Sequence, residues 1–500
     1  MGEYRRYGSL MLVVAACLAA LSGANISCAG FDELSALPAG MPPTIRPDYS
    51  GSVIPPNIAP LNFTITDAGE RFALVISSGK GPNISLVSTS PEMAIPPGKW
   101  HRLLQQNAGN ELKFQIYSRR DGRWYSYSPI TNRIAPEPVD RYLTYRLSYP
   151  QFYMKDRLEI RQRDLESFEE ELILSPKEGC FNCHTFYRHS TDKFLFQARF
   201  YGKNYLLLHD QGKTSLITPV LRRPGSSYAS WHPNGNLIAF ATDAKVSVSV
   251  FAAGKGAEEV LEYTDLDGDL AVYNIQSNTM STTPAISRED RVENQPAWSP
   301  DGKFLYFLSS PKVAKRDFVK VQYDLQRIGY DADRNTWGEV ETLVSAREAG
   351  RGCTFPAVSP DGRFLLFSMT DRGSFSIIRQ GTDLYLMDLG KKSYRKLEIN
   401  SDHADSYHAW SSNSRWIVFT SKRNEGIFGK LFFSYIEGDG TAHKPMVLPQ
   451  QDPRFYEEFT KSFQRAEFTT EPFRVSLADL NQIVGDTDKV ITAVYEGERL

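Results

Sequence analysis

The sequence predicts an all-β protein, namely a β-propeller of about five to seven blades. The first observation is a repeated ten-residue pattern that begins at Trp231 (WHPNGNLIAF), Trp298 (WSPDGKFLYF), Val358 (VSPDGRFLLF) and Trp410 (WSSNSRWIVF). The second is a high aromatic content of 12%, which favours strands. The third is a length of 500 residues with 41% hydrophobic residues, enough to bury the core of a large ring of sheets.

Each copy of the pattern reads as a tight turn followed by a buried strand. Asp and Gly tolerate the left-handed conformation that such a turn requires, and the apolar run after it, for example Phe304 to Leu308, suits a strand covered on both faces. A weaker copy lies at 192–196, and a second pattern, read as the neighbouring strand, occurs at 205–210, 270–274 and 384–388. We count five such units between about residues 185 and 455, at a period typical of propeller blades.

The rest of the chain divides by composition. We expect a signal peptide at 1–27, an extended Pro-rich lead-in at 28–60, and a β-rich N-terminal domain or degenerate blades at 61–160. A short helix and a cysteine-bearing loop follow at 161–188, then the blades at 189–455 and a C-terminal tail at 456–500 with a helix near 477–483. The net charge of -2 gives no reason to expect nucleic-acid binding.

The first residues have the anatomy of a secretory signal. Arg5 and Arg6 precede an apolar run over 10–21, which is too short to span a bilayer, and small residues allow cleavage after Ala24. An ordinary N-terminal helix is the alternative. Cys28 leaves open a lipoprotein signal with a lipid anchor at that cysteine. We therefore expect export to the periplasm or cell envelope of a bacterium.

The segment Cys180-Phe181-Asn182-Cys183-His184 has the CxxCH spacing of c-type haem attachment. Two thiols bond to the two vinyl groups of one porphyrin, and His184 is thereby placed as the proximal iron ligand. Half a zinc site, a thioredoxin-like redox pair and a strained disulfide are the alternatives. The first lacks a second CxxC or HxxxH, and the second lacks a strand–helix context. The sequence predicts one haem c held through Cys180 and Cys183.

The distal iron ligand is left open by the sequence, and a five-coordinate iron is an alternative. The candidates are the remaining histidines and several methionines: His101, His189, His209, His232, His403, His408, His443, Met154, Met280, Met369 and Met387. His403 and His408 are the more open candidates, because His232 falls on a repeat position and His189 is only five residues from His184.

The blade pattern resembles that of TolB-type β-propellers. The wider arrangement is similar to exported bacterial propeller proteins with a c-type haem motif, often labelled TolB-like or cytochrome c biosynthesis proteins. That similarity rests on the segments at 54–63, 180–184, 231–233 and 404–416. It implies haem attached through Cys180 and Cys183 with His184 axial.

Three further features are interpreted as structural. The acidic residues of 166–171 fit a solvated helix face better than a docking site for a basic partner, and 265–269 (DLDGD) fits a turn better than a calcium loop. Cys353 is expected to be a passive thiol. It precedes a blade pattern where other copies carry Ser226, Glu293 and Asp405.

These features favour an electron-transfer protein that acts with redox partner proteins of the cell envelope. A propeller that binds a protein or glycan, with a structural or sensory haem, is the alternative. A haem enzyme such as a peroxidase is the third reading, and whether the protein is an enzyme stays open.

Overall fold

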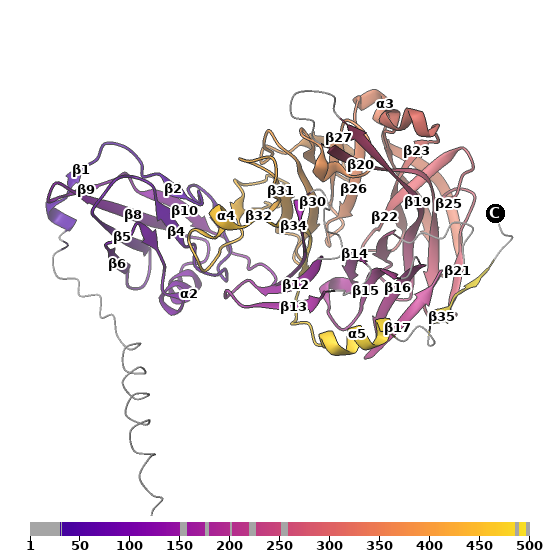
Figure 1. The fold of residues 1–500 in the computed structure, drawn as a ribbon, viewed down its shortest axis with the longest axis horizontal. Coiled ribbons are helices and arrows are strands. Elements are labelled where there is room, and N and C mark those ends of the chain that lie inside the picture. The colour runs from indigo at the N-terminus through magenta and orange to yellow at the C-terminus, as the bar shows by residue number, and fades with distance from the viewer. Residues whose placement is uncertain are drawn as a thin grey trace, which may run out of the picture.

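The computed structural model describes residue 31 and residues 33–150, 158–175, 180–200, 203–219, 227–251, 259–485 and 490–496. The predicted signal, Cys28 and Met154 lie outside these residues. The chain forms two lobes, a smaller N-terminal lobe and a larger ring of sheets (Figure 1). No helix within the described ranges is long and apolar enough to cross a membrane.

The N-terminal lobe contains a seven-stranded sheet. Its strands are β1 (Leu37–Pro38), β3 (Val53–Ile54), β5 (Arg71–Ser78), β6 (Ile84–Ser88), β8 (Glu111–Arg120), β9 (Arg123–Ser126) and β10 (Ile130–Ile134). A small sheet of β2 (Ile45–Arg46), β4 (Phe63–Ile65) and β7 (Glu92–Met93) accompanies it. The helix α2 (Pro97–Gln106) begins at a proline and buries Trp100, whose indole donates to the Ile58 carbonyl at 2.9 Å. The segment predicted as an extended lead-in therefore contributes strands to this lobe.

The larger lobe is a β-propeller of six blades in the described part of the chain. Blade one is β14 (Cys180–Phe186), β15 (Phe194–Phe200), β16 (Lys203–Asp210) and β17 (Lys213–Thr218). Blade two is β18 (Ser227–Trp231), β19 (Leu237–Phe251), β20 (Glu259–Asn274) and β21 (Thr279–Ser281). Blade three is β22 (Arg291–Trp298), β23 (Phe304–Pro311), β24 (Asp324–Asp331) and β25 (Thr336–Val344). Blade four is β26 (Gly352–Val358), β27 (Phe364–Thr370), β28 (Asp383–Asp388) and β29 (Ser393–Lys396). Blade five is β30 (Asp405–Trp410), β31 (Trp416–Ser421), β32 (Lys430–Tyr435) and β33 (Met446–Val447).

Blade six joins the two ends of the chain. Its innermost strand is β34 (Ser462–Thr469), which pairs antiparallel with β11 (Tyr142–Ser148). β12 (Glu159–Asp164) and β13 (Glu170–Leu174) complete the sheet. The innermost strands of successive blades are neighbours, and β34 lies next to both β30 and β14, so the ring is closed. The propeller thus includes residues on both sides of the predicted range of 189–455.

Two sequence predictions near β13 and β14 are wrong. The predicted helix near 164–174 is the turn and second strand of a hairpin, because Arg163 pairs across the strands with Glu170 and Arg161 forms a 2.7 Å ion pair with that glutamate. Cross-strand pairing thus outweighs the helical spacing of the apolar residues. The predicted cysteine-bearing loop is β14, because this segment pairs along β15 and fills the gap in the ring beside β34. The helix predicted at 477–483 is present as α5 (Leu477–Gly485).

The repeated sequence pattern marks the turn between the first and second strand of blades two to five. In blade three, Ser299 Oγ donates to Asp301 Oδ1 at 2.6 Å and accepts from Phe304 N at 3.0 Å. The same two bonds recur in blades four and five. Each turn therefore carries its own side-chain hydrogen bonds, which explains why the pattern repeats.

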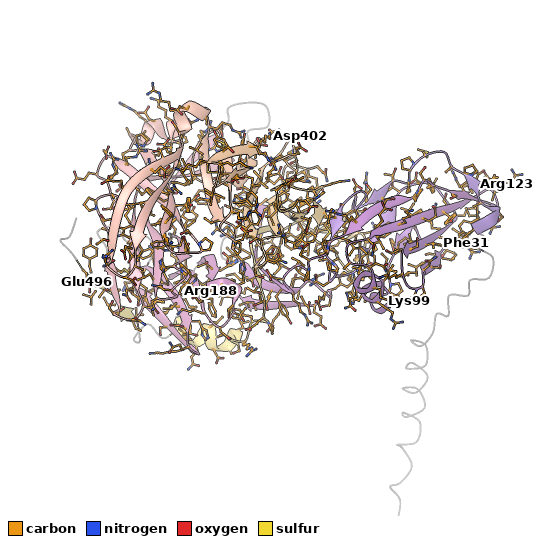
Figure 2. The ribbon with its side chains drawn as sticks, turned by 180° about the vertical axis from the view of Figure 1, so that it is seen from behind. Phe31, Lys99, Arg123, Arg188, Asp402 and Glu496 are labelled. Carbon is orange, nitrogen blue, oxygen red and sulfur yellow. The ribbon has the colours of Figure 1, made fainter. Side chains whose placement is uncertain are left out.

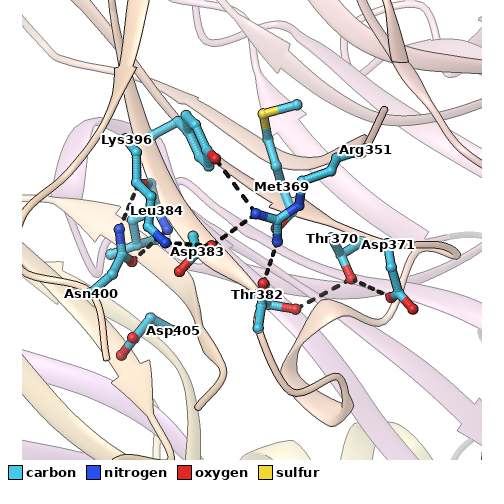
Figure 3. Close-up of polar contacts among 12 residues, drawn as sticks. Arg351, Met369, Thr370, Asp371, Thr382, Asp383, Leu384, Lys396, Asn400 and Asp405 are labelled. Atoms are coloured by element: carbon cyan, nitrogen blue, oxygen red, sulfur yellow. Dashed lines mark hydrogen bonds and ion pairs between the residues drawn. The ribbon is translucent and has the colours of Figure 1, made fainter. Parts of the chain in front are cut away.

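Ion pairs tie the start of an innermost strand to the third strand of its blade. Arg291 contacts Asp324 at 2.8 Å in blade three, and Arg351 contacts Asp383 at 2.8 Å in blade four. Figure 3 shows the second of these, with Lys396 reaching the same carboxylate at 2.9 Å. These ion pairs connect the start of the first strand to the start of the third strand in blades three and four. The sequence pattern did not indicate them.

The two lobes share one continuous hydrophobic cluster, which runs from the N-terminal sheet into blades four, five and six. Trp416 of blade five donates its indole N–H to the Glu137 carbonyl at 3.1 Å, and Asn62 donates to the Gln451 carbonyl at 2.9 Å. Figure 2 shows Phe31 and Arg123 at the end of the N-terminal lobe that lies away from the propeller.

The remaining elements are short or cover the outside of the ring. They are the 3₁₀ turns η1 (Glu33–Ser35), η4 (Tyr187–His189), η5 (Lys315–Lys320) and η6 (Ser376–Ile378), and the helices α3 (Ala346–Ala349) and α4 (Phe455–Glu458). The last strands, β35 (Ile491–Thr492) and β36 (Val494–Tyr495), pair in parallel with β17 and β21. They cover the outer edges of blades one and two.

Candidate functional site

The CxxCH segment forms β14, the innermost strand of blade one. Cys180 pairs with Arg199 and His184 pairs with Phe196 of β15. The register shifts between Phe181 and His184, so one extra residue is accommodated there as a β-bulge. The side chains of Cys180, Asn182 and Cys183 lie outside the described residues, whereas the backbone strand is described.

His184 is buried in the interior of blade one, with 2% of its surface exposed. Its imidazole ring lies 5.8 Å from the ring of Phe186 and 6.1 Å from that of Phe196. Neither ring nitrogen has a hydrogen bond of good geometry, although the backbones of Thr144 and Arg465 lie beside the ring. Burial lowers the pKa of His184 to about 3, and the positive charges of Arg465 and Arg146 act in the same direction. The ring is therefore a neutral imidazole with free lone-pair capacity, the form that binds a metal.

The other five innermost strands carry the same bulge as β14. The first residue inside each of these bulges has a positive φ: Tyr228 (53°), Gln295 (48°), Phe355 (53°), Tyr407 (51°) and Arg465 (51°). Such backbone is costly for residues other than glycine, by about 1 to 3 kcal/mol each. Its recurrence around the ring indicates that the bulge belongs to the blade design and aims these side chains alike.

These five side chains meet at the axis of the ring. The Arg465 guanidinium lies over three aromatic rings from other blades, at 5.8 Å from Tyr228, 5.1 Å from Phe355 and 5.7 Å from Tyr407. Gln295 accepts a 2.6 Å hydrogen bond from the backbone N–H of Phe355. We call this set of five residues the axial ring.

A cavity of about 260 Å³ lies against the axial ring, and we call it the central cup. Its walls are the second residue of each bulge and the residues that follow it. These residues are small or apolar in blades two to four. Trp298 of blade three and Trp410 of blade five belong to the wall. Thr185 and Phe186, directly after the CxxCH segment, belong to the same wall. Thr185, His189 and Ser230 are partly exposed, so the cup opens to solvent.

Two ionisable side chains stand out in this wall. Glu467 of β34 accepts a hydrogen bond from the Phe186 backbone N–H at 3.2 Å, and burial raises its pKa to about 7. His408 of β30 is 8% exposed, and burial lowers its pKa to about 4. Glu467 lies in the segment predicted as a tail, so the sequence gave no reason to place it beside the cysteine motif.

The structure separates the candidates for a distal iron ligand. His101 is on α2 of the N-terminal lobe, and His443 bonds Glu437 at 3.0 Å. His209 is stacked on Phe194 and bonds Thr214, and His232 bonds the Gly302 carbonyl at 3.1 Å. Met280, Met369 and Met387 lie in hydrophobic clusters between blades. Of the described candidates, His189 and His408 line the central cup.

The remaining predicted features are structural in the described residues. Cys353 is a buried free cysteine, and burial raises the pKa of its thiol. The turn predicted at 265–269 is wrong, because this segment is the middle of β20. Asp265 accepts hydrogen bonds from Asn294 and Ser374, at 2.6 and 2.7 Å. No group of three His, Cys, Asp or Glu side chains suited to a metal occurs among the described residues.

The axial ring was missed by the sequence analysis, although a signal for most of it exists. Four of its members lie three residues before the first residue of the ten-residue pattern: Tyr228, Gln295, Phe355 and Tyr407. Aligning the copies further towards the N-terminus would have found them. Arg465 and Glu467 have no such turn after them, because β34 is not followed in the chain by its partner strand.

No family model and no curated protein matches this chain. Among solved structures, TolB from Acinetobacter baumannii superposes with a TM-score of 0.42 at 15% identity, over 72% of this chain and 79% of that chain. A hypothetical selenium-binding protein from Sulfolobus tokodaii gives a TM-score of 0.39 at 9% identity, over 81% and 94%. A chain of a nidogen/laminin complex gives 0.37 at 9% identity, over 65% and 97%.

Proposed function

We propose that this protein is an exported monohaem c-type cytochrome built on a six-bladed propeller, and that it exchanges electrons with redox partner proteins of the cell envelope. The observation that carries the proposal is His184. It ends a CxxCH motif, is 2% exposed, and has two ring nitrogens without a hydrogen bond of good geometry. A buried polar group in that condition is costly unless a ligand or metal satisfies it.

The register of the innermost strands supports a covalently held haem. The five positions equivalent to Cys183 on the other innermost strands are Ala229, Pro296, Pro356, His408 and Ala466, and all of them line the central cup. Cys183 shares its register position in the bulge with these five residues. Cys180 and Cys183 would hold the porphyrin, and His184 would bind the iron from the strand itself.

The propeller would supply a rigid setting of mixed polar and apolar side chains for this group. A bound haem supplies one-electron chemistry, and the protein sets its potential through ligands, burial and hydrogen bonds. Trp298 and Trp410 and the prolines of the bulges in blades three and four form the apolar part of the wall. The partly exposed residues at its opening, Thr185, His189 and Ser230, would give a partner protein access to the cup.

Covalent haem can be tested directly on the full chain expressed with a c-type maturation system. Denatured wild-type protein should keep a haem stain and a mass increase of one haem. The double variant Cys180→Ser, Cys183→Ser should lose both. Cys353→Ala is the matched control, because it removes a buried thiol outside the motif and should retain the haem. A wild-type protein without covalent haem, after correct processing of the signal, would refute the proposal.

A binding module is the second candidate, and the central cup favours it. The cup presents aromatic side chains and a buried carboxyl group at the axis of a propeller, the kind of concave surface that holds a ligand. In that case the haemless double variant should bind the same protein or glycan partner as the wild type. Loss of binding together with loss of haem would favour the electron-transfer function.

Export is part of the proposal. The basic start, the apolar run and the small residues before Ala24 support a secretory signal, and Cys28 supports a lipid anchor as a further option. Cell fractionation with mass spectrometry of the mature N-terminus distinguishes cleavage after Ala24 from lipidation at Cys28.

A further inference from the structure

We propose that the central cup binds a small organic acid, whose carboxylate contacts the Arg465 guanidinium and whose apolar body lies against the aromatic and proline residues of the wall. This inference goes beyond the proposed function, because it uses no residue of the CxxCH motif. It names the chemical class of a ligand for the cavity at the axis of the ring.

Arg465 is the charged member of the axial ring. It belongs to β34 and lines the cup, where its side chain is partly exposed. Its backbone has a φ of 51°, and the four other axial residues with the same strained backbone are tyrosine, glutamine, phenylalanine and tyrosine. Strain of this kind is stored at ligand-binding sites, where it aims a side chain at the ligand. The axial ring therefore places one permanent positive charge at the cup.

The aromatic rings around Arg465 decide the sign of the ligand. The guanidinium lies 5.8 Å from the ring of Tyr228, 5.1 Å from that of Phe355 and 5.7 Å from that of Tyr407. Aromatic faces attract a cation, and here an arginine of the chain itself takes that place. A ligand cation would be repelled by the guanidinium, whereas a carboxylate matches its planar edge with two parallel hydrogen bonds. The axial ring thus favours an anion.

The wall of the cup suits a compact apolar body. The cavity of about 260 Å³ limits the ligand to a small molecule. The apolar part of the wall includes Trp298, Trp410, Pro296 and Pro356. At the opening, Ser230 Oγ accepts a 3.0 Å hydrogen bond from the Trp298 backbone N–H, so its own proton can donate to a ligand oxygen. An acid with an aromatic or branched body covers this wall, whereas a free phosphate ion would leave it in contact with water.

Glu467 gives the site a second, opposite control. Among the described residues that line the cup it is the one carboxyl group, and it stands two residues after Arg465 on β34. Burial raises its pKa to about 7, so at pH 8 it carries a negative charge. That charge repels a second carboxylate in the same cavity. Removing it should strengthen the binding of an acid, while removing the Arg465 charge should weaken it.

The test is isothermal titration calorimetry of the purified full chain at pH 8 with phenylacetate, its neutral analogue phenylacetamide, and inorganic phosphate. Phenylacetate should bind at one site per chain, and the other two probes should bind weaker by about tenfold or more. Arg465→Gln should weaken phenylacetate binding by about tenfold or more, because the charge and the fork of donors are lost. Glu467→Gln should strengthen it.

Ala409→Leu covers the case in which Arg465→Gln fails to fold. Ala409 lines the cup and is partly exposed, so leucine fills the cavity and should abolish binding while the arginine stays. Arg334→Gln is the matched control, since it removes an arginine that is 80% exposed and outside the cup, and it should bind as the wild type does.

Four results would overturn the inference. They are no saturable binding of phenylacetate, equal binding of phenylacetamide, equal binding of phosphate, and wild-type affinity in Arg465→Gln. The haemless variant Cys180→Ser, Cys183→Ser should bind phenylacetate as the wild type does. Failure of this inference therefore leaves the proposed cytochrome intact, and absence of covalent haem leaves this inference intact.

Discussion

Glu293 shows how a single buried carboxyl group can shape the pH response of this protein. It lies at the inner end of blade three with 0% of its surface exposed. Its carboxylate accepts bonds from Ser309 Oγ at 3.1 Å and from the Arg288 backbone N–H at 3.2 Å. Burial raises its pKa from 4.5 to about 7, and the Asp269 charge adds to the effect. The folded protein therefore holds a proton on Glu293 that the unfolded chain releases.

We predict that Glu293 lowers the free energy of unfolding as pH rises from 4.5 to 7. In that window the folded state binds more protons than the unfolded state, so stability falls with pH, and the full penalty persists above pH 7. Glu293→Gln imitates the protonated form. At pH 8 the variant should be more stable than the wild type by about 2 kcal/mol, and at pH 4 the two should be equal. Urea unfolding across this range measures the difference.

The buried histidines impose the opposite slope, which is why the comparison must be between variants. Burial lowers the pKa values of His209 and His232, so the unfolded chain binds more protons than the folded one as the pH falls below about 6.5, and stability rises with pH there. Glu339→Gln removes an exposed carboxylate of β25 and is the control. A wild-type-like pH profile for Glu293→Gln would contradict the prediction.

The repeated turn of blade three connects two strands and also contacts blade two. Gly302 and Gly362 occupy the same position in successive turns, with φ of 74° and 72°. A Cβ atom on Gly362 would meet nothing within 4 Å. A Cβ atom on Gly302 would lie 2.5 Å from the His232 Nε2 atom, because the Gly302 carbonyl oxygen is hydrogen-bonded to that histidine in the preceding blade. The turn of blade three therefore also forms part of the contact with blade two.

We predict different costs for the two alanine substitutions. Gly362→Ala should lower the free energy of unfolding by about 1 kcal/mol, the cost of left-handed backbone for alanine. Gly302→Ala adds a steric clash with a buried ring and should cost about 3 kcal/mol. Chemical denaturation of both variants provides the comparison. Equal losses in the free energy of unfolding would mean that the His232 ring moves aside at no measurable cost.

Strands defined by local turns could be predicted from the sequence, whereas strands defined by distant pairing could not. The turn pattern located the second strand of blades two to five correctly, because each turn is stabilised locally by residues such as Ser299 and Asp301. Local spacing failed at 164–174, where the partner of Glu170 is Arg161 on the neighbouring strand. It also failed for Arg465 and Glu467, since their place in the ring depends on pairing with β11, more than 300 residues earlier. The motif Cys180 to His184 could be read directly, but its place in a strand could not.

The fold of the whole molecule depends on the pairing of β34 with β11 in blade six, which we call the joint. β34 alone supplies the innermost strand of blade six, and β11 to β13 supply the rest. The N-terminal lobe rests on blades four to six through the shared hydrophobic cluster. By contrast, β35 and β36 pair only with the outer strands β17 and β21, two residues each.

We predict unequal effects of two truncations. A chain ending at Gln451 lacks β34 and should lose cooperative thermal unfolding, because blade six and the wall of the cup are incomplete. A chain ending at Gly485 lacks only the outer strands and should keep a cooperative transition, with a Tm lower by a few degrees. Circular dichroism melting curves distinguish them. Cooperative unfolding of the shorter chain at a wild-type Tm would refute the role assigned to the joint.

The joint also sets an order of events during synthesis and export. Strands β11 to β13 are made before β14, but their innermost partner β34 is made almost last. The ring therefore cannot close while the chain is still emerging, and the β34 side of β14 stays uncovered throughout. Covalent haem attachment needs an accessible, unfolded CxxCH segment. On the proposed function, late closure would give the attachment machinery time to reach Cys180 and Cys183 before the propeller closes.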